Sequence, residues 1–248
     1  MLRLAALLAL GAAGCAAQTQ SDRMQSDQAL PIEALPARPS TAQSAPVQPQ
    51  LIDIHRVAPN IRVDMRYYGD ENFTGRPVPG YEAPQCLLSL EAAHALGGAQ
   101  AELAEYDLGL KVFDCYRPQR AVDAFAAWAK DPADTLRKAD YYPDVPKSEL
   151  FERGYIARRS GHSRASTVDL TLVDLESGKE LDMGSGYDLF DTLSWPADPR
   201  PDAQQRANRL LLRQAMLGVG FRPLKQEWWH FTLADEPYPD SYFDVPVR

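Results

Sequence analysis

The sequence predicts a single α+β domain preceded by an N-terminal extension. Segments with the hydrophobic period of helices and segments with the alternation of strands follow one another in mixed order, without a regular strand–helix–strand repeat. The chain has 248 residues, of which 45% are hydrophobic and 24% charged, the composition of a globular protein that can bury a full core. These observations favour one compact domain over residues 51–248.

The beginning of this domain is expected to be extended and loop-rich. Apolar residues alternate in short runs between Ile52 and Met65, which predicts extended segments, interrupted at Pro59. Residues 69–84 are rich in Gly, Pro and Asn and predict a loop.

Two helices and a strand are predicted next. Ser89 is a suitable N-cap for a helix that ends near residues 107–109. Residues 110–114 predict a strand, and residues 119–130 predict a second helix that is ended by Pro132 and the residue before it.

The second half of the domain contains another strand, a helix and a final extended region. Residues 167–175 alternate between apolar and polar side chains, so Asp169 is expected on a strand. A third helix is predicted from about Asp202 to Leu217, and the chain from Phe221 to Leu233 is predicted to return as strands.

Residues 1–15 have the pattern of an export signal. Arg3 supplies a positive charge, an apolar run follows, and small residues precede Cys15. This pattern resembles a bacterial lipoprotein cleavage site, at which Cys15 would be lipidated; ordinary secretion and an uncleaved anchor are the alternatives. The protein is therefore expected in the periplasm or cell envelope, with a lipid anchor as its one membrane contact.

Residues 16–50 are rich in Gln, Ser, Pro and Ala and predict a disordered tether. A flexible chain of this length reaches about 30–35 Å on average, so the domain would stand off a membrane. The formal net charge of −8 and the lack of a concentrated basic surface argue against nucleic acid as a partner. No protein partner is predicted.

Cys86 and Cys115 are the other two cysteines of the chain. In an exported protein an isolated pair of cysteines favours a disulfide, and two free buried thiols are the alternative. Neither cysteine belongs to the metal site predicted below.

The polar residues His162, Asp169, Glu227 and His230 predict a split zinc site. Two imidazoles and one carboxylate leave zinc with an open fourth position, and a second carboxylate can act on the water that fills it. The chain has only four histidines, which makes a chance pairing with an acid less frequent. This combination of residues indicates hydrolysis.

Glu227 and His230 lie three positions apart, on opposite faces of an ideal strand, so the chain must bend there for both to face one cavity. The alternative is that Glu227 is a surface acid beside an aromatic core strand. Arg117 follows a predicted strand and precedes a helix, where its guanidinium can donate to an oxyanion. A structural ion pair with Asp114 or another acid explains Arg117 equally well.

The chain resembles the D-alanyl-D-alanine dipeptidase family, zinc peptidases related to the vancomycin-resistance dipeptidase. The resemblance rests on several separated motifs that occur in the right order over most of residues 60–231. The matching stretches are residues 72–75, 86–88, 114–122, 160–164, 168–172, 182–184, 187–191 and 227–231. It implies the fold shared by the hedgehog domain and the DD-peptidases, a mostly antiparallel sheet packed by helices.

The resemblance also implies a role for each site residue. One zinc ion per chain would be bound by His162, Asp169 and His230, with Glu227 as general base and Arg117 stabilising the tetrahedral intermediate. Ser160 and Asp188 would line the pocket for a small zwitterionic dipeptide, with Asp188 facing its ammonium group.

The sequence departs from the family pattern Ser-x-His-x-x-Gly-x-Ala-x-Asp at two positions, which hold Ala165 and Thr167. If the backbone at Ala165 needs a positive φ, the alanine costs on the order of 1 kcal/mol, so a local shift is expected rather than loss of the site.

The function expected from the resemblance is zinc-dependent hydrolysis of D-Ala-D-Ala to two D-alanines in the bacterial envelope. One alternative is a zinc DD-carboxypeptidase that trims peptidoglycan stem peptides. Another is a non-catalytic, zinc-stabilised binding lipoprotein, which would need neither Glu227 nor Arg117.

Overall fold

The computed structural model describes residues 48–248. The predicted export segment with Cys15, and most of the predicted tether over residues 16–50, lie outside the described residues. Among residues 48–248, none of the helices has both the length and the apolar character that a bilayer crossing requires.

A five-stranded sheet forms the centre of the domain, with the strand order β2-β4-β5-β7-β6. Only β2 and β4 pair in parallel, and the other neighbours are antiparallel, so the sheet is mostly antiparallel as expected. The strands are β2 (Arg62–Val63), β4 (Leu108–Asp114), β5 (Thr167–Asp174), β6 (Phe221–Pro223) and β7 (His230–Leu233). A separate antiparallel pair joins β1 (Leu51–Asp53) to β3 (Leu87–Ser89).

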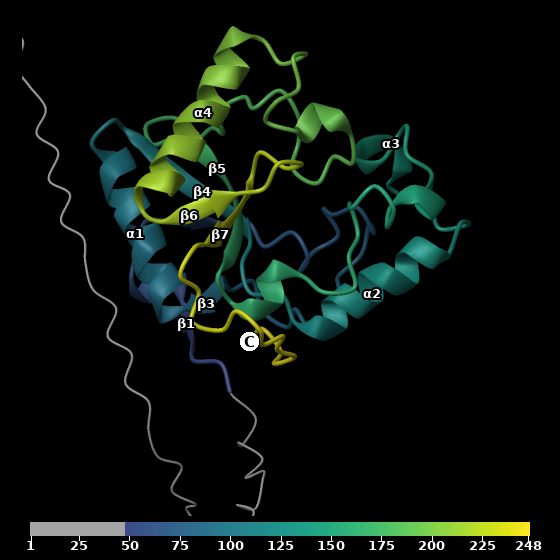
Figure 1. Cartoon of the computed structure of the whole chain (residues 1–248). Helices are drawn as coiled ribbons and strands as arrows, with labels where there is room; N and C mark the ends of the chain where they lie inside the picture. The colour runs from purple at the N-terminus through teal and green to yellow at the C-terminus, as the bar shows by residue number, and fades with distance from the viewer. Residues whose placement is uncertain (1–47) are drawn as a thin grey trace, which may run out of the picture. The chain divides into compact units, whose positions relative to one another are not determined.

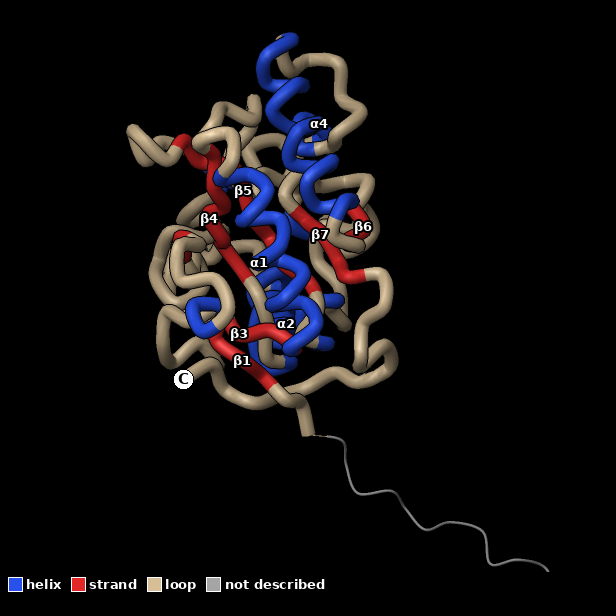
Figure 2. The backbone as a smooth tube through the Cα atoms, turned by 90° about the vertical axis from the view of Figure 1, so that its left-hand side faces the viewer, coloured by secondary structure: helices blue, strands red, loops and turns tan. Residues whose placement is uncertain are grey.

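The helices cover the two faces of this sheet unequally. The long helices α1 (Leu90–Ala104) and α4 (Ala203–Gly218) lie together on one face, in front of the strands in Figure 2. On the other side lie α2 (Gln119–Lys130) and the short α3 (Lys138–Tyr141), as Figure 1 shows. The α+β class predicted from the sequence is confirmed.

The alternation of apolar and polar side chains along β5 shows which face of the sheet holds the polar site residues. Val168, Leu170 and Leu172 are fully buried in the hydrophobic core. Because side chains alternate along a strand, Asp169 and Thr171 project from the opposite face, away from α1 and α4. Asp169 is therefore held on a rigid strand in the centre of the sheet.

The predicted helix starts follow their capping residues. The Ser89 hydroxyl accepts a hydrogen bond from the amide of Ala92 at 3.3 Å, and α1 begins directly after it. In α4, Asp202 and Gln205 form a reciprocal capping box with two hydrogen bonds of 2.8 Å.

Several boundaries differ from the prediction. Helix α1 ends at Ala104, and a turn in which Asp107 has a φ of 58° leads into β4 two residues earlier than expected. Residues Ile54–Arg56 form the 3-10 helix η1 and not an extended segment, because the Asp53 carboxylate accepts a hydrogen bond from the amide of His55 at 2.8 Å. Strand β3 and helix α3 were not predicted from the sequence.

The C-terminal region is not continuous strand. Residues 224–229 form a loop between β6 and β7 that contains a turn at residues 228–229, and Glu227 lies directly before this turn. The strand periodicity that would separate Glu227 from His230 does not apply there. The bend that the spacing of these two residues required is therefore a turn.

Cys86 and Cys115 form a disulfide with a Cα–Cα distance of 5.2 Å, and both residues are fully buried. The bond ties the residue before β3 to the residue after β4, which are separated by 29 positions in the sequence. It anchors the segment that carries Asp114 and Arg117.

Replacement of both cysteines by alanine is expected to lower the free energy of unfolding by about 3.5 kcal/mol, because the unfolded chain regains the entropy of a loop of this length. Urea unfolding of the oxidised protein and of the Cys86→Ala/Cys115→Ala variant measures this difference. A loss below about 1 kcal/mol would contradict the expected stabilisation by the disulfide.

Candidate metal centre and active site

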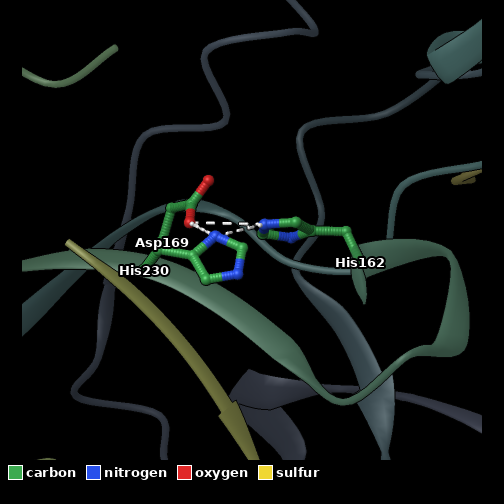
Figure 3. A group of neighbouring side chains, drawn as sticks. All are labelled: His162, Asp169 and His230. Carbon is green, nitrogen blue, oxygen red and sulfur yellow. Dashed lines mark hydrogen bonds and ion pairs between the residues drawn. The ribbon is translucent and has the colours of Figure 1, made fainter. Parts of the chain in front are cut away.

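Three side chains meet on the face of the sheet opposite α1 and α4. His162 lies on the 3-10 helix η3 (Gly161–Arg164), and Asp169 on β5 pairs in register with His230, the first residue of β7. The His162 Nε2 atom is 3.3 Å from Asp169 Oδ1 and 3.3 Å from His230 Nδ1. The distance between His230 Nδ1 and Asp169 Oδ1 is 3.0 Å. Figure 3 shows the three groups pointing toward one another.

This arrangement fits a mononuclear zinc ion. Zinc bonds to nitrogen and oxygen are about 2.0–2.1 Å long, so tetrahedral ligand atoms lie about 3.3–3.4 Å apart. The three separations of 3.0–3.3 Å are close to that spacing. Moreover, Asp169 Oδ1 is buried and accepts no hydrogen bond from the described residues. A bound cation would satisfy this oxygen.

The orientation of His162 is set by a backbone carbonyl. The Nδ1–H group of His162 donates to the carbonyl oxygen of Cys115 at 2.7 Å, which leaves the Nε2 lone pair directed at the cluster. In return, the amide of Arg117 donates to the carbonyl oxygen of His162 at 3.3 Å. Cys115 and Arg117 therefore fix both the tautomer and the position of His162, a predicted metal ligand.

The two departures from the family pattern lie around η3. Ala165 ends η3 with a φ of 65° and a ψ of 18°, so an alanine occupies the left-handed conformation that glycine adopts more easily. The Thr167 hydroxyl lies 2.9 Å from that of Thr232. A Cβ atom on Gly161 would come within 2.8 Å of the Thr167 hydroxyl, so a larger residue at Gly161 would require Thr167 to shift. The three ligand atoms converge with both residues present.

Glu227 reaches the cluster from the loop before β7. Its Oε2 atom lies 3.3 Å from His230 Nδ1, the atom that faces the other two ligand groups. Burial raises the pKa of Glu227 to about 7, although His230 and Arg117 act in the opposite direction. A pKa near neutrality suits a general base.

Arg117 forms the ion pair with Asp114 that the sequence left open, and its role toward an oxyanion stays a prediction. Its Nε and Nη2 atoms lie 2.9 and 2.8 Å from Asp114 Oδ2, which makes a buried ion pair. The guanidinium stacks over the rings of Tyr67 and Phe125, and Nη2 is 3.7 Å from Asp169 Oδ2. The ion pair therefore holds the guanidinium beside the candidate metal ligands.

The cluster opens into a cavity of about 240 Å³. The predicted residues that line it are Arg117, Ser160, His162, Asp169, Asp188, Glu227 and His230. Ser160 caps η3, where its hydroxyl oxygen accepts from the amide of His162 at 3.3 Å. Asp188 is 6% exposed, and burial raises its pKa well above the ordinary value. A cation beside this buried acid would favour its ionised form.

The structure adds two site residues that sequence reasoning missed. Tyr67 also lines the cavity, and Tyr187 contacts Asp169. Tyr187 stands next to Asp188 in a matching stretch, which was an available signal, whereas Tyr67 belongs to no motif. His94 is exposed on α1, and it does not belong to the cluster.

The α+β domain has a cavity above a His–Asp–His cluster, with a partly buried glutamate and an arginine beside it. These features define a candidate metal-dependent enzyme. Comparison with known proteins identifies the family. The family profile described as D-ala-D-ala dipeptidase matches residues 48–248. The chain belongs to this peptidase family.

Individual relatives agree with the family match. The chain is 44% identical over 194 residues to a D-alanyl-D-alanine dipeptidase of Streptomyces coelicolor, covering 78% of this chain and 96% of the relative. It is 41% identical over 195 residues to a D-alanyl-D-alanine dipeptidase from Enterococcus faecium, covering 79% of this chain and 96% of the relative. It is 35% identical over 194 residues to a D-alanyl-D-alanine dipeptidase from Escherichia coli, covering 78% of this chain and 88% of the relative.

Proposed function

We propose that the protein is a zinc-dependent dipeptidase that hydrolyses D-Ala-D-Ala to two D-alanines in the bacterial cell envelope. The observation that carries the proposal is the convergence of His162, Asp169 and His230 within 3.3 Å, beside Glu227. We infer the substrate, D-Ala-D-Ala, from the names of the related proteins.

His162 Nε2, Asp169 Oδ1 and His230 Nδ1 would hold the ion. When bound, zinc supplies an acidified water and polarises the peptide carbonyl. Glu227 removes a proton from the attacking water and returns it to the leaving amine. Arg117 donates hydrogen bonds to the oxygen that becomes negatively charged.

The ends of the cavity suit a free dipeptide. The carboxylate of Asp188 accepts from the substrate ammonium, which compensates its burial. Ser160 can donate its hydroxyl proton to the terminal carboxylate. An N-acylated substrate brings no cation to Asp188 and leaves this buried acid without a charged partner, which favours a dipeptidase over a carboxypeptidase.

The envelope location is supported by the predicted export signal and by the disulfide between Cys86 and Cys115, since disulfides persist in oxidising compartments. Lipidation of Cys15 would attach the domain to a membrane. Mass spectrometry of the protein from a bacterial membrane fraction tests the lipidation of Cys15. An unmodified N-terminus that begins after Ala16, or a Cys15 with a free thiol, would contradict this anchor.

The first experiment measures amino-acid release from D-Ala-D-Ala and from N-acetyl-D-Ala-D-Ala by the purified protein, with its zinc quantified. One zinc per chain, loss of activity on chelation, recovery with zinc, and cleavage of only the free dipeptide are expected. Cleavage of the acetylated substrate would instead assign a carboxypeptidase, and bound zinc without either activity would contradict the proposed function.

A further inference from the structure

Two tyrosines connect Asp169 of the candidate metal centre to Asp188, a second acid that lines the cavity. The Tyr187 hydroxyl lies 3.1 Å from Asp169 Oδ2 and 3.2 Å from the Tyr67 hydroxyl. The Tyr67 hydroxyl donates to Asp188 Oδ2 at 2.6 Å. All four residues are at most 7% exposed, so water does not compete freely for these groups.

The two phenols act on different carboxylates. Each tyrosine carries a single hydroxyl proton. The Tyr67 contact with Asp188 is the shortest of the three, which commits the Tyr67 proton to that carboxylate. The Tyr187 proton is then available to Asp169, since the Tyr67 oxygen is the more distant and uncharged acceptor.

The Tyr187 contact concerns the oxygen of Asp169 that does not face the histidines. Oδ1 of Asp169 lies within 3.3 Å of His162 and His230, whereas Tyr187 donates to Oδ2. The ring of Tyr187 is itself held by stacking on Phe113, with 4.7 Å between the ring centres. A donor on Oδ2 keeps the carboxylate plane from rotating and so keeps Oδ1 directed at the cluster.

Tyr67 is placed to act on Asp188. Its ring lies under the Arg117 guanidinium at 5.0 Å, and its hydroxyl donates to Asp188. Burial raises the pKa of Asp188, and the hydrogen bond from Tyr67 opposes this shift by favouring the ionised carboxylate. Without this donor the acid is a poorer partner for an ammonium group.

We propose that Tyr67 and Tyr187 are a contacting pair of positioning residues with divided roles, in which Tyr187 holds the metal ligand Asp169 and Tyr67 holds Asp188 for the amino end of the substrate. This inference rests on the proposed function for the role of Tyr67. The role of Tyr187 depends only on metal binding.

Single tyrosine-to-phenylalanine variants separate the two roles, because each removes one hydroxyl and keeps the ring. Zinc dissociation constants are measured by chelator competition on the metal-free proteins, and kcat and KM for D-Ala-D-Ala are measured at saturating zinc. Tyr142→Phe is the matched control, since Tyr142 is fully buried and its hydroxyl donates to the Asp134 carbonyl at 3.2 Å, outside the cavity.

Tyr187→Phe is expected to weaken zinc binding by about 10–100-fold, with KM within twofold of wild type. Tyr67→Phe is expected to raise KM by roughly tenfold, with kcat and zinc affinity within twofold of wild type, because a buried hydrogen bond to a charged group is lost. Thermal unfolding of the metal-free proteins should show losses no larger than that of Tyr142→Phe.

Wild-type zinc affinity in Tyr187→Phe, or the same loss of zinc affinity in Tyr142→Phe, would overturn the role of Tyr187. A parallel fall in kcat and zinc affinity in Tyr67→Phe would show general loosening and overturn the division of roles. If the wild-type protein does not cleave the dipeptide, the proposed function fails, while the zinc measurements still decide the role of Tyr187.

Discussion

Replacing Glu227 with glutamine is expected to lower kcat by about 10²–10⁴-fold, because the amide cannot take a proton from the attacking water. Zinc should remain bound, since His162, Asp169 and His230 form the predicted ligand set without Glu227. The substitution preserves size and shape, so the buried site keeps its packing. Single-turnover kinetics and zinc content of the same preparation measure both effects.

The matched control is Glu152→Gln, which makes the same chemical change at an exposed position. It should keep wild-type kcat and zinc content. If Glu227→Gln retained more than a tenth of the wild-type kcat, another group would have to be the base. If it lost its zinc, Glu227 would be a ligand.

The second large effect is expected at Arg117. Arg117→Lys keeps a positive charge beside Asp114 but loses the planar pair of donors, and kcat should fall on the order of 10²–10³-fold. Arg117→Ala should also lower the free energy of unfolding by about 3–5 kcal/mol, because fully buried Asp114 is left without its partner. Activity assays and urea unfolding separate these contributions.

Arg66→Lys is the control for the Arg117 variants. Arg66 also pairs with a nearby acid, with Nε 3.0 Å from Asp64 Oδ2, and stacks over the ring of Phe113 at 4.9 Å. It does not line the cavity of the metal centre. Near wild-type activity in both lysine variants would leave Arg117 with a purely structural role.

The sequence predicted the elements whose signals are local. Helix α2 spans Gln119–Lys130 as predicted, and α1 and α4 begin after the capping residues Ser89 and Asp202. The α+β class follows from the order of such segments. Local hydrogen bonds and side-chain periodicity act over a few residues, so they can be read from a single chain.

Elements defined by partners distant in sequence were missed. Strand β3 exists through its pairing with β1, more than thirty residues earlier, at Leu51 and Ser89. The turn after Glu227 was inferred only as a bend, and Ile54 was wrongly assigned to an extended segment. Strand pairing outweighs the local apolar pattern at β3, whereas at Ile54 the local hydrogen bond between the Asp53 carboxylate and the amide of His55 favours a 3-10 helix.

For the site, the sequence by itself determined the chemical types, because two histidines, two acids and an arginine in separated motifs limit what the chain can bind. Only the tertiary structure decided that Asp169 pairs with His230 across two strands, that the Cys115 carbonyl orients His162, and that Tyr67 and Tyr187 meet between two carboxylates. The physical reason is that strand register and burial set these distances, and both depend on the packing of the whole domain.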